Sequence, residues 1–363
     1  MVKIGLEITR ANKNNKTGTE WYAWHLFQKF KELDNTNKFF IYFNNDLAES
    51  LKEIPANFYL KRLLWPFKKF WTHIRLSIEL ILHPVDKFFA SNALPLFVRG
   101  EVILTVHDLG FLKNPELYHP LERIYQKISH ILAIKRANKI IAISKATKKD
   151  IIHYFPKYKD KIKVIYNGYN SDSFKLINNN EKKEIREKYN LPLKYILYIG
   201  RLETKKNIQN LIKGYKLIKN KDIPLILGGK PGNYGYNEIK ELAKNEKNII
   251  FLGYIPQEDY QLLLASSFIF VFPSKFEGFG IPILEAMASG VPIICSNIPV
   301  FKEITEDSVL LFNPDNIKDI TYVIDKIINN NKLRDQLIKK GLDQVKKFSW
   351  NKSAKDILNY ILE

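Results

Sequence analysis

Two glutamates and three glycines stand close together in the segment 272–290, which reads FPSKFEGFGIPILEAMASG. The pattern predicts a strand, a loop punctuated by glycines, and a helix that begins at about Ile281 and ends at the last glycine. The N–H groups of the first helical turn, with the loop glycines, would bind an anion such as a diphosphate. Glu285 accepts hydrogen bonds when it is ionised and suits the paired hydroxyls of a ribose, and Glu277 lies earlier on the loop. The alternative interpretation is a capped helix with two surface glutamates.

A second segment, 198–208, reads YIGRLETKKNI; it also follows a predicted strand and opens a helix. It places two cations, Arg201 and Lys206, at the carboxyl end of that strand. A diphosphate leaving group gathers negative charge as its bond to a sugar breaks, and cations stabilise that charge. Arginine offers a planar fork for two oxygens, and lysine a point charge. The alternative is a basic loop in a basic protein.

In this order and spacing, the two segments resemble the retaining glycosyltransferases of family 4, the group 1 enzymes, which have the GT-B architecture. The resemblance covers nearly the whole chain. It implies that Arg201 and Lys206 hold the diphosphate of a nucleotide sugar and that Glu285 binds its ribose. Glu277 would contact hydroxyls of the transferred sugar, and Ile255 would lie near the nucleobase. The donor-binding residues that the resemblance implies are Gly18, Arg201, Lys206, Ile255, Glu277, Gly278, Phe279, Gly280, Ile281 and Glu285.

In the first half of the chain, the predicted strand 102–106 ends in His107 and Asp108. A neutral imidazole at this position could hydrogen-bond the donor sugar or orient the acceptor. The resemblance places His107 at the sugar, as a catalytic group together with Arg201, Lys206 and Glu277. Asp108 is expected beside it on the acceptor side.

The loop 16–22 follows the first predicted strand and opens a helix. The family often has paired glycines here, whose amides approach the β-phosphate when the domains close. This chain keeps Gly18 but has Thr17 before it, which puts the closing geometry in question. Three further side chains of this loop are expected to shape the acceptor pocket: Glu20, Trp21 and Tyr22.

Short apolar runs rich in β-branched residues alternate with amphipathic stretches, as in parallel sheets covered by helices on both faces. They predict strands at residues 3–8, 39–43, 102–106, 139–143, 163–166, 195–199, 225–227, 248–251, 268–272 and 292–295. The pattern occurs twice, and the polar segment 171–184 between the two occurrences is expected to be a linker.

We therefore expect an α/β protein of the GT-B fold, with two Rossmann-like, doubly wound parallel-sheet domains that face each other across a cleft. Ligands of such sheets bind at the carboxyl ends of the strands. Residues 1–172 would form the acceptor-binding domain and residues 173–345 the donor-binding domain. The resemblance implies that 346–363 form a helix that crosses back to the first domain.

The 363 residues carry a formal net charge of +19, with 45% hydrophobic and 26% charged residues. The basic excess could attract an anionic partner such as a membrane surface, or it could be a compositional bias spread over solvated faces. The segment 61–71, KRLLWPFKKFW, is either an interfacial segment or a helix that packs on the first domain. The start of the chain reads as a strand rather than a signal peptide, and its apolar runs fall short of a membrane span. A cytoplasmic enzyme is therefore expected, and peripheral binding at the inner face of the cell membrane stays open.

These observations predict a retaining glycosyltransferase that moves a hexose, mannose or glucose, from a nucleotide sugar to a saccharide or lipid-linked acceptor in cell-surface polysaccharide synthesis. No cofactor and no catalytic metal are expected, since the sequence has no Asp-x-Asp pair at a strand end and no Cys/His cluster. A nucleotide-sugar epimerase of the same architecture is the alternative. A nucleic-acid partner is not expected, because binding driven by charge would leave the 272–290 segment unexplained.

Overall fold

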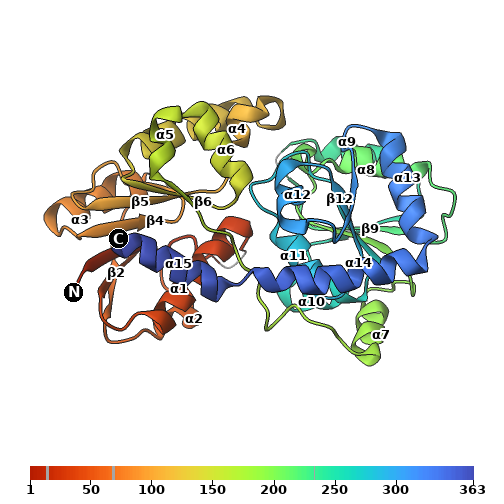
Figure 1. Ribbon diagram of the computed structural model, residues 1–363, viewed down its shortest axis with the longest axis horizontal. Helices are drawn as coiled ribbons and strands as arrows, with labels where there is room; N and C mark the ends of the chain where they lie inside the picture. Colours follow the sequence, from red (N-terminus) through yellow and green to blue (C-terminus); the bar gives the residue numbers. More distant parts are fainter. Residues whose placement is uncertain (14–15, 68–69, 233) are drawn as a thin grey trace. The chain divides into compact units, whose positions relative to one another are not determined.

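The computed structural model describes the whole chain except residues 14–15, 68–69 and 233, and it divides into two compact units (Figure 1). The first unit comprises Met1–Lys113, Leu121–Gly168 and Trp350–Glu363. The second comprises Asn114–Pro120 and Tyr169–Ser349. Each is an α/β unit built on one parallel sheet, as the alternation of apolar runs and amphipathic stretches predicts.

The first unit contains a seven-stranded parallel sheet with the order β3-β2-β1-β4-β5-β6-β7. Its strands are β1 (Lys3–Glu7), β2 (Lys38–Phe43), β3 (Phe58–Arg62), β4 (Lys87–Ala90), β5 (Glu101–Val106), β6 (Lys139–Ala142) and β7 (Ile162–Val164). The strand order reverses at β1, which pairs with β2 on one side and β4 on the other. Ligands of doubly wound sheets bind beyond the carboxyl ends of the strands at such a reversal.

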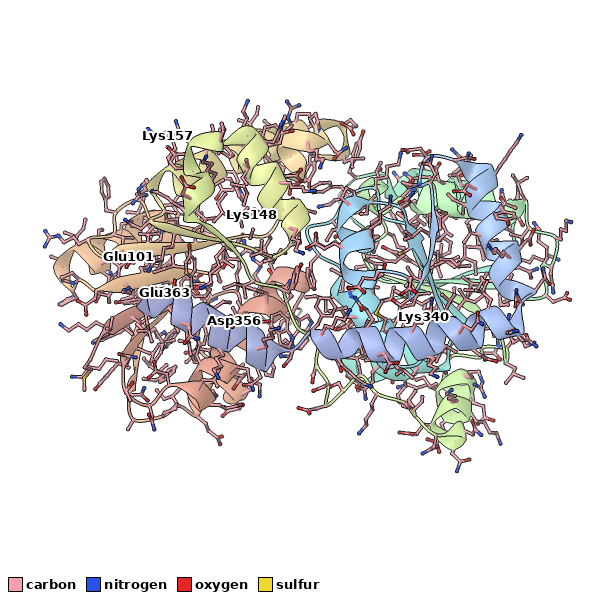
Figure 2. The ribbon with its side chains drawn as sticks, viewed as in Figure 1. Glu101, Lys148, Lys157, Lys340, Asp356 and Glu363 are labelled. Carbon is pink, nitrogen blue, oxygen red and sulfur yellow. The ribbon has the colours of Figure 1, made fainter. Side chains whose placement is uncertain are left out.

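Helices cover both faces of this sheet, with α1 and α15 along one face and α5 and α6 along the other (Figure 1). The helices of the unit are α1 (Gly18–Leu33), α2 (Glu49–Lys52), η1 (Trp71–Arg75), α3 (Leu76–Leu82), α4 (Gly110–Lys113), α5 (Pro120–Arg136), α6 (Lys145–Tyr154), η3 (Pro156–Lys161) and α15 (Trp350–Leu362). The C-terminal helix α15 is held in this unit by contacts with β7 and the residues that follow it. The Glu363 carboxylate lies 2.9 Å from Lys163 Nζ, and the Ser353 hydroxyl donates to the Tyr166 carbonyl; Figure 2 shows Glu363 at the end of this helix.

The second unit contains a six-stranded parallel sheet with the order β10-β9-β8-β11-β12-β13. Its strands are β8 (Ile196–Ile199), β9 (Leu225–Gly228), β10 (Ile249–Gly253), β11 (Ile269–Phe272), β12 (Ile293–Ser296) and β13 (Leu310–Phe312). The order reverses at β8, between β9 and β11. The loops that leave β8 and β11 therefore start side by side.

The second unit is also covered on both faces, by α8, α9 and α13 on one side and α10, α11 and α14 on the other (Figure 1). Its helices are η2 (Pro115–Leu117), α7 (Asn179–Lys188), η4 (Thr204–Lys206), α8 (Ile208–Lys216), α9 (Tyr236–Ala243), α10 (Gln257–Ser266), α11 (Ile281–Ala288), α12 (Pro299–Thr305), α13 (Ile317–Ile328), α14 (Asn331–Gln344) and η5 (Val345–Lys347). Within the described residues, no helix combines the length and apolar character that crossing a membrane requires.

All ten strands predicted from the sequence are present, and three strands, β3, β4 and β13, were not predicted. The expected linker 171–184 is wrong from residue 179 onward, because α7 begins there. Asn178 caps this helix: its side-chain oxygen accepts from the backbone N–H groups of Asn180, at 2.9 Å, and Glu181, at 3.0 Å. A run of polar residues that supplies a helix cap and a solvated helix face looks like a linker in sequence.

The segment 61–71 is not the packed helix considered above. Its first two residues end the edge strand β3, and its last residue, Trp71, begins η1. The Trp71 ring is buried, and its Nε1 donates to the Leu63 carbonyl at 2.7 Å. Lys68 and Lys69 lie outside the described residues.

Candidate functional site

The loops after β8 and β11 meet at the carboxyl edge of the second sheet. The backbone N–H of Lys275 donates to the Lys205 carbonyl at 3.1 Å, and the Lys206 ammonium forms an ion pair with the Glu277 carboxylate. The side chains of this pair are mostly buried, 18% exposed for Lys206 and 16% for Glu277. Two residues that the sequence predicted for one site are therefore in contact, although 71 positions separate them.

Arg201 lies at the same edge, and a buried tyrosine holds its backbone in place. Its side chain is exposed, while its backbone carbonyl accepts a hydrogen bond of 2.9 Å from the hydroxyl of the buried Tyr198 on β8. Burial raises the pKa of Tyr198 well above its ordinary value, so this hydroxyl stays a donor at neutral pH. The arrangement fixes the backbone at Arg201 and leaves the guanidinium accessible to an anion from solvent.

The helix α11 begins where the sequence predicts, immediately after Gly280. This glycine has a φ of 142°, a conformation that other residues rarely adopt, and its carbonyl accepts from Ile283 N at 3.0 Å. A Cβ here would lie 3.0 Å from the Ile304 side chain and 3.1 Å from Phe301. The preceding Phe279 is buried, with its ring 5.9 Å from that of Phe348. Close packing on two sides thus fixes where the first turn of α11 points.

Glu285 on α11 is held by Tyr260 on α10, whose hydroxyl donates to the carboxylate. Burial raises the pKa of Glu285 to about 7, and the hydrogen bond from Tyr260 opposes this rise. The sequence-based expectation treated Glu285 as an ionised acceptor. The structure makes it a carboxyl group that titrates near neutral pH, because its surroundings disfavour the charge.

The ends of β8, β9 and β10 approach each other through glycines. Gly229 N donates to the Gly253 carbonyl at 2.7 Å, and a Cβ on Gly229 would lie 1.8 Å from the Gly200 carbonyl oxygen. A Cβ on Gly228 would lie 2.3 Å from Ile255, the residue expected near the nucleobase, which is buried here. The Gly-Gly pair after a predicted strand was the sequence signal for this close approach, and it was missed.

In the first unit, His107 follows β5 at the carboxyl edge of the sheet. Its Nε2 lies 2.8 Å from the Ser91 carbonyl oxygen, and its ring packs against Tyr22 at a centroid distance of 4.8 Å. Burial lowers the pKa of His107 to about 4, so the imidazole is neutral at pH 7. Because a carbonyl only accepts, Nε2 carries the proton and Nδ1 carries the lone pair. The adjacent Asp108 accepts from Gly110 N at 2.8 Å, at the start of α4.

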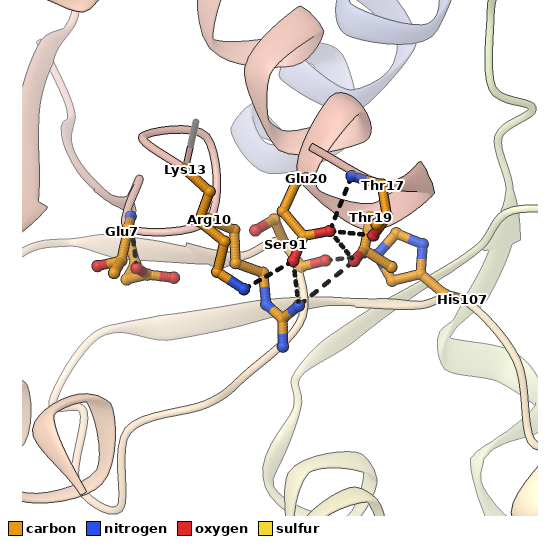
Figure 3. Close-up of polar contacts among 9 residues, drawn as sticks. Glu7, Arg10, Lys13, Thr17, Thr19, Glu20, Ser91 and His107 are labelled. Carbon is orange, nitrogen blue, oxygen red and sulfur yellow. Dashed lines mark hydrogen bonds and ion pairs between the residues drawn. The ribbon is translucent and has the colours of Figure 1, made fainter. Parts of the chain in front are cut away.

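Glu20 joins the start of α1 to the residues that follow β1 (Figure 3). Its carboxylate lies 2.9 Å from Lys13 Nζ and 3.2 Å from Arg10 Nη1, and it accepts from the N–H of Thr17, the N-cap of α1, at 3.2 Å. Burial raises the pKa of Glu20, but the contacts with Thr17, Lys13 and Arg10 outweigh burial and lower it to about 2. Glu20 therefore carries a permanent charge that is already paired. Sequence reasoning missed Arg10 and Lys13, which lie outside any motif.

The remaining predicted residues of this loop differ in accessibility. Gly18 begins α1 with open space where a Cβ would stand. Trp21 is half-buried, with Lys16 Nζ 5.4 Å above its ring. Tyr22 was expected to shape the acceptor pocket, but it is buried beneath His107, and its hydroxyl pairs with Thr105 at 3.0 Å. Tyr22 and Trp21 are neighbours on α1, and consecutive residues of a helix point in different directions. The Tyr22 side chain therefore points toward the core while Trp21 stays half-buried.

Gly18, His107 and Asp108 thus belong to the first unit, and Arg201, Lys206, Glu277 and Glu285 to the second. Within the part of the chain that the structure describes, no three His, Cys, Asp or Glu side chains lie together as a metal site would need. The absence of a catalytic metal stays a prediction.

Comparison with known proteins covers both halves of the chain. A family model described as glycosyltransferase family 4 matches residues 17–173, and one described as glycosyl transferases group 1 matches residues 180–344. The O-antigen chain mannosyltransferase B of Escherichia coli is 32% identical over 320 residues, which are 86% of this chain and 82% of that protein. The serotype-specific mannosyltransferase WbdA of Escherichia coli is 30% identical over 268 residues, 71% of this chain but 33% of that protein.

Among solved structures, the Anabaena protein HepE in complex with UDP and glucose matches with a TM-score of 0.77 at 18% identity. The match covers 99% of this chain and 99% of that one. At this identity the likeness establishes the fold, two Rossmann-like units of the GT-B type. The relatives named here that have assigned activities are transferases, and none supports the epimerase alternative.

Proposed function

This chain belongs to the family 4, group 1 glycosyltransferases and transfers a sugar from a nucleotide sugar, and we propose that the sugar is mannose. The relatives named as mannosyltransferases support this choice over glucose. The observation that carries the site assignment is the ion pair between Lys206 and Glu277 at the carboxyl edge of the second sheet. It joins the two motifs from which a donor site was expected.

In this proposal the donor diphosphate binds Arg201 and Lys206 next to the first turn of α11. As the bond between the sugar and the diphosphate breaks, negative charge grows on the diphosphate oxygens, and the two cations stabilise it. The pair with Glu277 holds the Lys206 ammonium in place before the donor arrives, so little reorganisation is needed. Glu277 in turn accepts hydrogen bonds from sugar hydroxyls and is not a covalent nucleophile.

We assign Glu285 to the ribose and the backbone from Gly278 to Ile281 to the sugar. His107, being neutral with its lone pair on Nδ1, would accept a hydrogen bond from a sugar hydroxyl rather than act as a strong acid. The acceptor hydroxyl attacks the face from which the diphosphate leaves, and the departing phosphate takes the proton. The configuration at the anomeric carbon is then retained. Two cations meet the diphosphate directly in this scheme, so turnover should persist in EDTA.

For the acceptor, we propose a growing saccharide chain carried on a lipid, in the synthesis of a cell-surface polysaccharide at an anionic membrane surface. The relative named for O-antigen chain synthesis supports this acceptor class. On the acceptor side, the half-buried Trp21 offers a ring for contact with a saccharide. The carboxylate of Glu20 serves the acceptor indirectly, by fixing the start of α1.

The test begins with a panel of nucleotide sugars scored for thermal stabilisation and slow hydrolysis, in which a mannose-bearing nucleotide sugar should rank first. Arg201→Ala should then lower kcat for the best donor by about 30- to 1,000-fold, which corresponds to 2–4 kcal/mol of transition-state stabilisation. Its thermal stability should stay unchanged because Arg201 is exposed. Lys332→Ala, another exposed cation, on α14, is the matched control. Full turnover by Arg201→Ala would contradict the site assignment, whereas a different best donor would contradict mannose alone.

A further inference from the structure

The helix α5 of the first unit carries an apolar stripe on the side that faces solvent. Leu121 is 72% exposed and Ile128 is 56% exposed, and three further side chains of the helix continue the stripe at helical spacing: Ile124, Tyr125 and Leu132. The core side of the same helix is marked by the buried Ala133 and Ile134. A surface helix ordinarily turns its apolar stripe inward and its polar residues outward, so this helix has a second apolar face that needs explanation.

Neighbouring elements extend the stripe into a wider surface. In η1 and α3, Ile74, Ile78 and Leu82 are exposed at intervals of four residues, and the loop before β5 exposes Leu96 and Phe97. Direct contacts show that these elements are adjacent. His73 Nε2 lies 3.4 Å from the Tyr125 hydroxyl, Phe97 N donates to the Ser77 hydroxyl at 3.1 Å, and Arg136 donates to the Pro95 carbonyl at 2.8 Å. We call the ten exposed side chains of α5, η1, α3 and this loop the apolar face.

The charge around the apolar face is positive. On α5, Arg123, Lys127, Lys135 and Arg136 stand against a single acidic residue, Glu122. Arg99 follows the exposed loop, and Glu79 on α3 is paired with Arg75 at 3.1 Å. The surrounding sequence has the same sign, with 28 Lys and Arg against 16 Asp and Glu in residues 1–172. Long basic side chains can lie beside apolar ones and reach an anionic layer above them.

We propose that the apolar face docks on an anionic lipid surface, with its aliphatic and aromatic side chains among the acyl chains and its lysines and arginines at the headgroups. Apolar area combined with flanking cations is the combination that holds a helix in a membrane interface. A second copy of the chain fits less well, because a two-fold contact would bring the same positive rim against itself.

The benefit of membrane docking to the enzyme rests on the proposed lipid-linked acceptor, whereas the docking surface itself rests on the exposed side chains. When an enzyme is bound to the membrane that contains its acceptor, it reaches that acceptor by diffusion along the membrane surface. Transfer to a lipid-linked acceptor should therefore depend on the apolar face, while donor hydrolysis in solution should not. The chemistry at the second sheet lies in the other unit, so the two proposals can fail separately.

The experiment is co-sedimentation of the full chain with vesicles of phosphatidylglycerol and phosphatidylcholine in equal parts, compared with vesicles of phosphatidylcholine alone. The wild type should sediment with the anionic vesicles and be released by salt. Ile124→Gln/Ile128→Gln should lower the partition coefficient about tenfold or more, because two exposed aliphatic side chains no longer enter the acyl region. Arg123→Gln/Lys127→Gln should lower it about fivefold per residue on anionic vesicles.

Leu193→Gln/Leu217→Gln is the matched control, since these leucines, at 72% and 59%, are at least as exposed as Ile124 and Ile128, both at 56%, but lie in the second unit. It should bind vesicles like the wild type, and all variants should keep the wild-type circular dichroism spectrum and rate of donor hydrolysis. Binding by the Ile124→Gln/Ile128→Gln variant equal to that of the wild type would overturn the proposal. So would a wild-type dimer that this variant converts to a monomer, because the face would then be a contact between copies.

Discussion

Tyr260→Phe tests whether Glu285 must be ionised to bind the donor ribose. The hydroxyl of Tyr260 donates to the Glu285 carboxylate and so favours its charged form, against burial. A hydrogen bond to a charged group contributes about 1.5–3 kcal/mol. One pKa unit corresponds to about 1.4 kcal/mol, so removal of this hydroxyl should raise the pKa of Glu285 by about one to two units.

The wild-type pKa of Glu285 is about 7. At pH 7.5 about three quarters of the wild-type carboxyls are then ionised, against roughly 3–25% in the variant. If the ribose binds the ionised form, the variant should bind the nucleotide sugar ~3- to 25-fold more weakly at pH 7.5 and recover above about pH 9.

Isothermal titration calorimetry with the best nucleotide sugar of the panel, from pH 6 to 9.5, measures this shift. The intact nucleotide sugar is the right ligand because, unlike a terminal phosphate, its diphosphate has no proton that titrates near pH 6. Tyr322→Phe, which removes an exposed hydroxyl on α13, is the control and should follow the wild-type curve. A wild-type affinity that is flat across this pH range, or a variant curve with an unmoved midpoint, would refute the reasoning.

Three further predictions concern stability. The folded-state pKa of Glu285, about 7, lies above its unfolded value of 4.5, so the free energy of unfolding falls as pH rises from 4.5 to about 7. Glu285→Gln should therefore be more stable than the wild type at pH 8, by up to about 3 kcal/mol, while it binds the donor less well. Glu20 has the opposite sign, with a folded pKa of about 2, so its stabilisation is present above pH 4.5 and lost as pH falls toward 2; thermal melts of Glu20→Gln should show a weaker loss over that window than the wild type. Gly229→Ala should lower stability by about 3 kcal/mol or more, since its Cβ would lie 1.8 Å from a backbone oxygen, and a melting temperature equal to that of the wild type would contradict the close approach.

The sequence by itself determined the elements whose signal is local. A buried parallel strand is a short apolar run, and a glycine-rich loop before a helix has its own pattern, so the strand, loop and helix of the segments 198–208 and 272–290 were predicted correctly. The strand β3 was missed because all its residues after Phe58 are exposed and give no apolar run. The helix α7 was missed because its capping residues look like a linker.

Only the tertiary structure decided which distant side chains meet. Tyr260 and Glu285, or Arg10 and Glu20, share no motif, and their contacts follow from how helices and loops pack against the two sheets. Burial raises the pKa of both carboxyl groups, but at Glu20 the contacts with Thr17, Lys13 and Arg10 outweigh burial and lower it, whereas at Glu285 burial prevails. The apolar stripe on α5 also could not be placed from the sequence, because helical spacing of apolar residues does not say whether the stripe faces the core or the solvent. Packing decides that, since it depends on what the rest of the chain places beside the helix.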